Sequence, residues 1–185
     1  MSPWRLRQIA RQITQGAIIA YPTDTIWGLG CHPLLQQSVL EIQRIKRRST
    51  RKALILLASQ LEQLLPYIEP DNRHLHLLSI PSPTVRPVTW LVKASKHCPH
   101  WLTGNSDKVA VRLTDRCQID LLCKAMQAPL VSTSANISGR KTIRNSLQAH
   151  KHFQPSVDYI IEGFATAKTQ ASEIRDLQTG KIIRS

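Results

Sequence analysis

The chain has 185 residues, 42% of them hydrophobic, which suits one folded domain with a substantial core. It carries 25 lysines and arginines against 12 acidic residues, a formal net charge of +13, so attraction to a polyanion such as RNA, DNA or a nucleotide is expected. No apolar run approaches the roughly 20 residues of a membrane helix, and the N-terminus lacks the apolar block of a secretory signal. We therefore expect a single domain over residues 1–185, located in the cytoplasm, with no membrane partner.

The N-terminal half of the chain alternates between helical and extended patterns. Apolar spacing predicts helices at residues 3–15, 34–47, 59–65 and 71–80, and strands at residues 17–21 and 53–58. Gly16 is a suitable stop for the first helix, and Ser59 is a candidate cap for the third.

The C-terminal half is richer in strands. The same reading predicts strands at residues 88–94, 109–114, 129–135 and 158–163, helices at residues 117–126 and 146–153, and a closing hairpin around Thr179-Gly180. Helices and strands mix without strict alternation. The pattern therefore predicts an α/β (α+β) fold in which helices flank a mixed parallel and antiparallel sheet.

The cysteines do not indicate a disulfide framework or a cysteine-rich zinc site. Four are present, and none forms a C-x-x-C pair. In the segment KHCPH, His97, Cys98 and His100 lie close together, and a zinc site there is the less favoured alternative to ordinary surface histidines. No protein-bound zinc is expected.

The stretch YPTDTIWGLG has the Gly-x-Gly spacing, at Gly28 and Gly30, that can announce a phosphate loop after a strand. However, no third glycine follows at the spacing of a dinucleotide fingerprint, and the chain contains no G-x-x-x-x-G-K-[ST] motif. Phosphate must then be held by side chains or by an unusual backbone. The two glycines are expected to let the backbone turn tightly.

Three other stretches carry polar chemistry: Pro22–Thr25, Lys46–Lys52 and Ser132–Arg140. Each has an ordinary interpretation, as a turn, a solvated basic face and a helix cap respectively. Together they offer hydroxyl groups, an amide and several cations, which suits a nucleoside triphosphate with a small polar substrate. Because no catalytic triad is evident, we expect nucleotidyl transfer, in which a carboxylate attacks the α-phosphate and a metal ion bridges phosphates.

Seven segments occur in the order found in the YrdC family: YPTDTIWGLGC, KRRSTRKALILLAS, PVTWLV, WLTG, VAVRLTD, PLVSTSANISG and SEIRD. From about Ala17 to its end the chain resembles this family, and within it the short bacterial TsaC-type threonylcarbamoyl-AMP synthases. The resemblance implies a twisted mixed sheet with a basic concave face. It also implies that L-threonine, bicarbonate and ATP, with Mg²⁺ accompanying ATP, give L-threonylcarbamoyladenylate and pyrophosphate. The partners implied are RNA (tRNA or double-stranded RNA) and the downstream threonylcarbamoyl-transferase proteins of tRNA N6-threonylcarbamoyladenosine modification.

The resemblance also assigns roles to residues of this chain. Lys46 and Arg48 match a K-x-R motif that holds the ATP phosphates, and they are the expected catalytic residues. The full ATP and phosphate set that the family motifs imply is Lys46, Arg48, Lys52, Ser132, Ser134 and Asn136. The threonine set is Thr23 and Arg112, with Ser172 as a further candidate. No metal ligand from a protein side chain is implied.

The geometry of the K-x-R motif sets a condition on the helix before it. Lys46 and Arg48 would point about 200° apart on a regular helix. Both can reach one triphosphate only if the helix ends near Lys46, with Arg47 pointing elsewhere. These are expected to be surface or cleft positions, so that replacing them should affect folding little.

The chain departs from the family motif at one turn. The family has W-P-G-P where this chain has Thr84-Val85-Arg86-Pro87, and Arg86 in place of glycine would strain a turn by roughly 1 kcal/mol or add a cation near the ligand.

Two alternative functions are open at this point. A non-catalytic RNA-binding module is the main alternative function, while a carbamoyl-phosphate-handling hydrolase would need an acid–base pair that is not evident. The expected RNA contacts outside the ligand motifs are Arg5, Arg7, Arg140 and Arg144.

Overall fold

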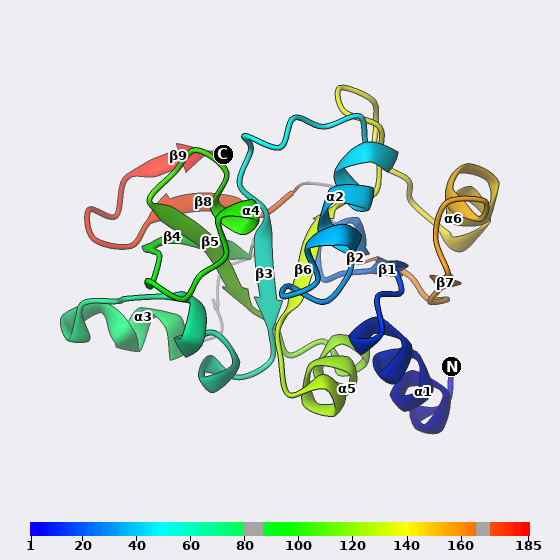
Figure 1. Ribbon diagram of the computed structural model, residues 1–185, viewed down its shortest axis with the longest axis horizontal. Helices are drawn as coiled ribbons and strands as arrows, with labels where there is room; N and C mark the ends of the chain where they lie inside the picture. The colour runs from blue at the N-terminus through cyan, green and yellow to red at the C-terminus, as the bar shows by residue number, and fades with distance from the viewer. Residues whose placement is uncertain (80–86, 166–170) are drawn as a thin grey trace.

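The computed structural model describes residues 1–79, 87–165 and 171–185, and its strands form one nine-stranded sheet (Figure 1). The strands are β1 (Ile19–Pro22), β2 (Trp27–Gly30), β3 (Ile55–Ala58), β4 (Val88–Lys93), β5 (Lys108–Leu113), β6 (Leu130–Ser134), β7 (Tyr159–Ile160), β8 (Glu173–Asp176) and β9 (Ile182–Arg184). Their order across the sheet is β7-β1-β2-β6-β3-β5-β4-β8-β9. The pairs β7–β1, β3–β5 and β4–β8 are parallel and the remaining neighbours are antiparallel, so the expected mixed sheet is confirmed.

Helices lie on both faces of this sheet. They are α1 (Pro3–Thr14), α2 (Gln36–Ile45), α3 (Leu75–Ser79), α4 (His100–Thr103), α5 (Cys117–Met126) and α6 (Ser146–Phe153). Single 3₁₀ turns occur at η1 (Leu61–Gln63), η2 (Leu65–Tyr67) and η3 (Asn72–His74). No helix within the described ranges is both long and apolar enough to cross a membrane.

Alternation along the strands builds two hydrophobic cores. In β1, Ile19 and Tyr21 face one core, while Ala20 and the preceding residue, Ile18, face the other. Helices α1 and α5 pack side by side on the first face, whereas α2, α4 and α6 contribute to the second (Figure 1). The buried side chains of α1 and α5 are Leu6, Ile9, Ala10, Ile13, Ile119, Leu122, Cys123 and Met126.

The ends of α1 follow from its local sequence. The Ser2 hydroxyl accepts a hydrogen bond from the Arg5 N–H at 3.3 Å, which satisfies one of the free donors of the first turn. The helix stops before Gly16, whose φ of +113° confirms the predicted terminator. The cap expected at Ser59 is wrong, because the following 3₁₀ turn is capped by Gln60.

Gly28 and Gly30 do not form a turn, so that expectation is wrong. Both lie in β2, and neither has a positive φ. A Cβ on Gly30 would lie 2.6 Å from the Val131 carbonyl oxygen and 2.9 Å from the Tyr21 ring. Gly30 therefore allows β2 to approach its neighbours closely, which only a residue without a side chain permits.

Helices α1 and α5 cover only part of one face of the sheet. The rest of that face, farther along the strands, is open. Ile55 on β3 is the register partner of Ala110 on β5 and of Ser132 on β6. These three side chains share the face of Leu57, two residues along β3, which is buried against α1 and α5. The open part of this face is the floor of the site described next.

Candidate active site

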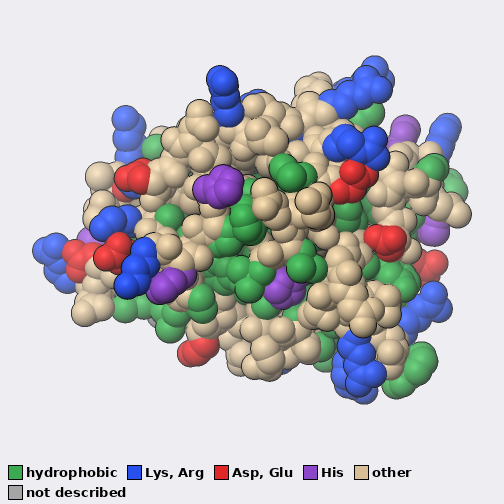
Figure 2. All heavy atoms as spheres, in the orientation of Figure 1, with side chains coloured by type: hydrophobic (Ala, Val, Ile, Leu, Met, Phe, Trp, Pro, Cys, Tyr) green, Lys and Arg blue, Asp and Glu red, His purple; other side chains and the backbone are tan. Residues whose placement is uncertain are grey.

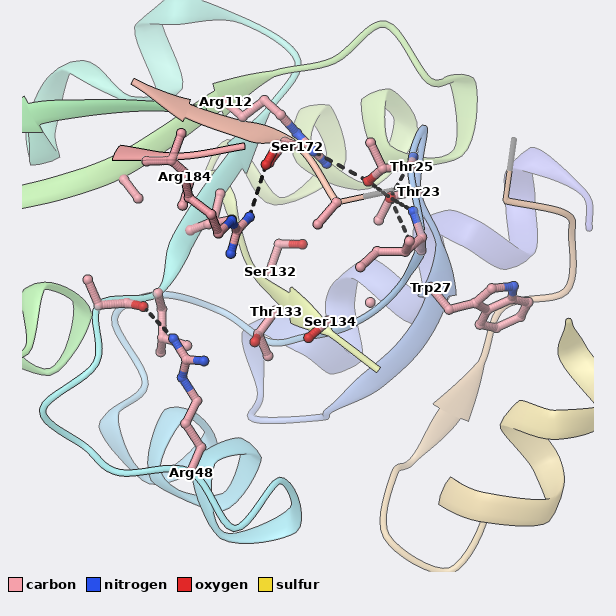
Figure 3. Close-up of a pocket in the computed structure, with 18 of the residues that line it drawn as sticks. Thr23, Thr25, Trp27, Arg48, Arg112, Ser132, Thr133, Ser134, Ser172 and Arg184 are labelled. Atoms are coloured by element: carbon pink, nitrogen blue, oxygen red, sulfur yellow. Dashed lines mark hydrogen bonds between the residues drawn. The ribbon is translucent and has the colours of Figure 1, made fainter. Parts of the chain in front are cut away.

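An open cleft of about 170 Å³ lies on this part of the sheet (Figure 3). Its polar lining comes from the β1–β2 turn, the loop after α2, β5, β6 and the closing hairpin. The polar residues concerned are Thr23, Thr25, Arg48, Arg112, Ser132, Thr133, Ser134, Ser172 and Arg184. Segments that are far apart in the sequence thus meet at one site, as the three motif stretches led us to expect.

The β1–β2 turn is locked by Thr23. Its hydroxyl donates to the Ile26 carbonyl at 2.6 Å and accepts from the N–H groups of Thr25 at 3.0 Å and of Ile26 at 3.2 Å. A hydroxyl has one donor and two acceptor positions, so these bonds use its whole capacity. Thr23 is therefore the residue that shapes this wall.

Arg112 forms the adjoining wall. Its side chain is 5% exposed, and its Nη2 donates to the Asp24 carboxylate at 2.9 Å. Its Nη1 lies 3.5 Å from the Thr25 hydroxyl oxygen. The buried Nε–H has no hydrogen-bond partner within the described part of the chain. An unsatisfied donor on a buried cation is costly, and the positive charge of the guanidinium favours an anionic ligand beside this wall.

Arg48 and Arg184 supply two further guanidinium groups, and Figure 3 shows Arg48 across the cleft from Arg112. Arg48 donates from Nη2 to the Ala53 carbonyl at 2.9 Å, and its buried Nε–H also lacks a partner among residues 1–79, 87–165 and 171–185. Burial, and then the charge of Arg184, lower the pKa of Arg48. Two cations held this close favour a multiply charged anion between them.

Arg184 was missed by sequence reasoning. It donates from Nη2 to the Ser172 carbonyl at 3.0 Å, while the Ser172 hydroxyl shares a 2.7 Å hydrogen bond with Thr89. The pairing of β8 with β9 brings the chain end back beside Ser172. The only available signal was a basic residue in the second strand of the predicted hairpin.

The end of α2 separates Lys46 from Arg48, as the K-x-R geometry required. The helix ends at Ile45, Lys46 is its cap, and Arg47 has a φ of +49°. The N–H of Arg48 donates to the Gln43 carbonyl at 2.9 Å and that of Arg47 to the Arg44 carbonyl at 3.0 Å, which is a Schellman motif. Because the chain reverses here, Arg48 reaches the cleft while Lys46 turns into the protein.

Replacing Arg47 with glycine is expected to stabilise the protein by about 1 kcal/mol, because the left-handed conformation penalises a side chain. The melting temperature should rise by about 2–4 °C. The matched control is Arg44→Gly, inside the same helix, which should lose about 1 kcal/mol. If Arg47→Gly melts as low as Arg44→Gly, the assignment of this cap is wrong.

Lys46 is buried, so the expectation of a surface or cleft position is wrong for this residue: its exposure is only 1%. Its ammonium donates to the carbonyls of Ser134 and Asn136, the latter at 2.8 Å, and to the Asn136 side-chain oxygen at 3.0 Å. Its own carbonyl accepts from the Ser138 N–H at 2.9 Å. Burial, and then the charge of Arg48, lower the pKa of Lys46 to about 8. The residue holds the loop after β6 from behind.

The same loop is tied together by its own side chains. The Ser134 hydroxyl donates to the Asn136 side-chain oxygen at 2.6 Å, and the Asn136 amide donates to the Arg140 carbonyl at 2.5 Å. The Ser132 hydroxyl accepts from the Tyr21 phenol at 2.8 Å, and burial raises the pKa of that phenol. Since Tyr21 remains a donor, the Ser132 hydroxyl hydrogen can point to a ligand.

Three predicted positions lie outside the lining of the cleft. Lys46 is hydrogen-bonded to Asn136 behind the loop after β6, and Lys52 is exposed in the loop before β3. Arg86, the departure from the family turn, lies outside the described residues. His97 and His100 are exposed, and among the described ranges no group of three or more His, Cys, Asp or Glu could hold a metal ion.

The sequence profile of the Sua5/YciO/YrdC family, described as "Telomere recombination", matches residues 11–185. The chain belongs to the Sua5/YciO/YrdC family. A threonylcarbamoyl-AMP synthase of Cellvibrio japonicus is 39% identical over 181 residues, which cover 97% of this chain and 95% of the relative. One of Pseudomonas fluorescens (strain Pf0-1) is 40% identical over 184 residues, which cover 100% and 98%.

Solved structures of the Sua5/YciO/YrdC family share the fold. P. abyssi Sua5 complexed with L-threonine has a TM-score of 0.88 and 27% identity, covering 98% of this chain. The match spans only 53% of that Sua5 chain. E. coli YciO has a TM-score of 0.85 at 23% identity and covers 100% of this chain and 90% of its own, which is a likeness of fold alone. The expected YrdC-like architecture is thus confirmed.

Proposed function

We propose that this chain acts as a single-domain threonylcarbamoyl-AMP synthase, a nucleotidyltransferase that forms L-threonylcarbamoyladenylate and pyrophosphate from L-threonine, bicarbonate and ATP. The observation that carries the proposal is the convergence of Arg48, Arg112 and Arg184 on one cleft, where two buried guanidinium N–H groups have no partner in the described parts of the protein. The relatives named threonylcarbamoyl-AMP synthase match nearly the whole chain and support the same reading. A module that only binds RNA would not need this convergence.

The threonine end of the cleft is the wall of Thr23 and Arg112. A substrate carboxylate would be attracted by the positive charge of the Arg112 guanidinium, whose orientation is fixed by Asp24. The methyl group of Thr23 would face the methyl group of the substrate. This arrangement leaves the substrate amino group free to react.

The phosphate end is the side of Arg48 and Arg184. The amino group of threonine attacks bicarbonate, and water leaves as the carbamate forms. A carbamate oxygen then attacks the α-phosphorus, the bond to the bridging oxygen breaks, and pyrophosphate leaves with the electron pair. Negative charge grows on the leaving group, so cations already in place stabilise the transition state most. The Ser132 hydroxyl lies between the two ends (Figure 3) and suits the carbamoyl group or the α-phosphate. Ser134 lines the same cleft, with its hydroxyl hydrogen donated to Asn136.

Magnesium would enter bound to ATP and would supply positive charge that offsets the charge of the phosphates. The Asp24 carboxylate forms an ion pair with Arg112 at the threonine end of the cleft, so it is not proposed as a magnesium ligand. We further propose that the product passes to threonylcarbamoyl-transferase proteins that modify tRNA. This use of ATP and tRNA would place the reaction in the cytoplasm.

The test is pyrophosphate release, which should require threonine and bicarbonate together with ATP. Serine lacks the methyl group that Thr23 would contact, so its kcat/KM should be lower by only about fivefold, or about 1 kcal/mol. Omission of threonine or of bicarbonate should abolish release. Equal release from ATP alone would show that the cleft does not support this reaction.

RNA binding is proposed separately, on exposed cations outside the cleft. Arg5 and Arg7 lie on α1, while Arg140 and Arg144 lie in the loop between β6 and α6, and Figure 2 shows further basic side chains around the periphery of one face. Phosphate contacts of this kind should weaken steeply with salt and show little sequence preference. Replacing all four arginines with glutamine should lower the salt slope of tRNA binding, whereas tight, salt-insensitive binding to one sequence would contradict the proposal.

A further inference from the structure

The Gly-x-Gly motif of β2 has no part in the proposed reaction, yet both of its glycines lie against the ring of Tyr21. A Cβ on Gly28 would lie 3.4 Å from the Tyr21 Cε1 atom, and a Cβ on Gly30 would lie 2.9 Å from the same atom. A real side chain cannot come as close as 2.9 Å without a shift of the ring. Strand β2 therefore offers the phenol ring a surface that only glycines can provide.

Tyr21 uses this surface to reach across β2. It lies on β1, and the order of the sheet places β2 between β1 and β6, the strand that carries Ser132. Since neighbouring strands are about 5 Å apart, the side chains of Tyr21 and Ser132 together bridge about 10 Å of the sheet. The Tyr21 hydroxyl lies 2.8 Å from the Ser132 hydroxyl oxygen, and the two residues are only 1% and 6% exposed.

The surroundings of Tyr21 fix the direction of this hydrogen bond. In residues 1–79, 87–165 and 171–185 the Tyr21 phenol has no hydrogen-bond partner besides the Ser132 oxygen. If Ser132 were the donor, the phenol hydrogen would be buried and unpaired, which is unfavourable. Burial also raises the pKa of the phenol, so Tyr21 keeps its proton. Tyr21 is therefore the donor and the Ser132 oxygen the acceptor.

The Ser132 hydrogen is then left for a ligand. Ser132 lines the cleft, and Figure 3 shows its hydroxyl between Arg184 on one side and Thr23 on the other. We propose that Tyr21 is a positioning residue, which holds the Ser132 hydroxyl as a donor toward a ligand oxygen where the carbamoyl group meets the α-phosphate. The identity of that oxygen rests on the proposed function, whereas the orientation of the Ser132 hydroxyl does not.

The first experiment is a double-mutant cycle on kcat/KM for pyrophosphate release. Tyr21→Phe keeps the ring and removes only the hydroxyl, and it should lower kcat/KM by about three- to tenfold, the size of one net hydrogen bond. In a Ser132→Ala background the same change should have no further effect, because Tyr21 acts only through the Ser132 hydroxyl. Tyr67→Phe, at a buried tyrosine outside the lining of the cleft, is the matched control and should keep the wild-type rate. An equal loss in both backgrounds, or no loss in either, overturns the proposal.

The second experiment tests the hydrogen bond without the reaction. Ser132→Ala leaves the buried Tyr21 hydroxyl without an acceptor and should lower the melting temperature by at least about 2–4 °C. Adding Tyr21→Phe should restore most of this loss, and a double variant that melts no higher than Ser132→Ala contradicts the assigned hydrogen bond.

A wild type that releases no pyrophosphate would refute the proposed function but not the role of Tyr21. The cycle is then measured as affinity for L-threonine and for ATP by calorimetry. An effect of Tyr21→Phe on either affinity that disappears in the Ser132→Ala background supports the positioning role. An effect of equal size in both backgrounds, or no effect, overturns it.

Discussion

Arg48→Ala should lower kcat/KM for adenylate formation by roughly 30- to 1000-fold, or about 2–4 kcal/mol in the transition state. The guanidinium reaches the cleft, its Nε–H is unpartnered within the described residues, and it lies near Arg184. Because the charge on pyrophosphate grows as it leaves, removing one cation raises the barrier more than it weakens ground-state binding. Steady-state pyrophosphate release, with all three substrates present, measures the loss.

Neighbouring substitutions control this result. Within the described residues the Arg48 side chain makes one hydrogen bond, to the Ala53 carbonyl, so Arg48→Ala should change the melting temperature little. Arg47→Ala should keep nearly full activity, because Arg47 is exposed at the helix cap. Arg48→Lys keeps a cation without the planar donors and should recover only part of the rate. If Arg47→Ala were as damaging as Arg48→Ala, the basic run would be a general polyanion surface rather than a phosphate clamp.

Much of the fold was accessible to sequence reasoning because local signals agree with tertiary packing. The helices at residues 117–126 and 146–153 were predicted to the residue, since each presents an apolar stripe that its core buries. Strand β2 was missed because WGLG contains two glycines, which usually weaken a strand. The close approach to Val131 that makes glycine necessary there is a long-range contact. Helix α4 has only four residues, too few for a periodic signal.

In the candidate site, too, some features could be predicted from the sequence and others could not. Thr23 follows the predicted strand at residues 17–21, while Arg112 and Ser132 lie within predicted strands, and the sheet register brings them to one cleft. The burial of Lys46 could not be seen, because a basic run reads as solvated surface. What buries Lys46 is a contact with Ser134 and Asn136, 88 and 90 residues farther along the chain.

Lys46→Met is the second large effect expected. Its ammonium donates to oxygens of Ser134 and Asn136, and without it these buried acceptors lose their shared donor. The free energy of unfolding should fall by about 1–3 kcal/mol at neutral pH. Activity should fall by roughly 100-fold, because the loop that places Ser132 and Ser134 beside the substrates is no longer held and displacements of about 1 Å carry that penalty. Lys46 is thus a positioning residue.

The pH dependence distinguishes this role from a simple loss of stability. The pKa of Lys46 is lowered to about 8 in the folded protein from an ordinary value of 10.5. Between these pH values the unfolded chain holds the proton and the folded chain does not, so the free energy of unfolding of the wild type should rise with pH relative to Lys46→Met, by up to about 3 kcal/mol.

Activity should change in the opposite direction over the same pH range. A neutral amine donates only two hydrogen bonds, yet all the partners of Lys46 are acceptors, so deprotonation loosens the loop as pH rises above about 8. The amino group of threonine becomes a better nucleophile with rising pH, so the substrate alone would give an increase. We therefore expect wild-type kcat to fall above pH about 8 and the low rate of Lys46→Met to rise. Parallel pH profiles of kcat and of urea unfolding measure both trends. A wild-type rate that keeps rising to pH 10 would mean that the charge on Lys46 does not hold the loop.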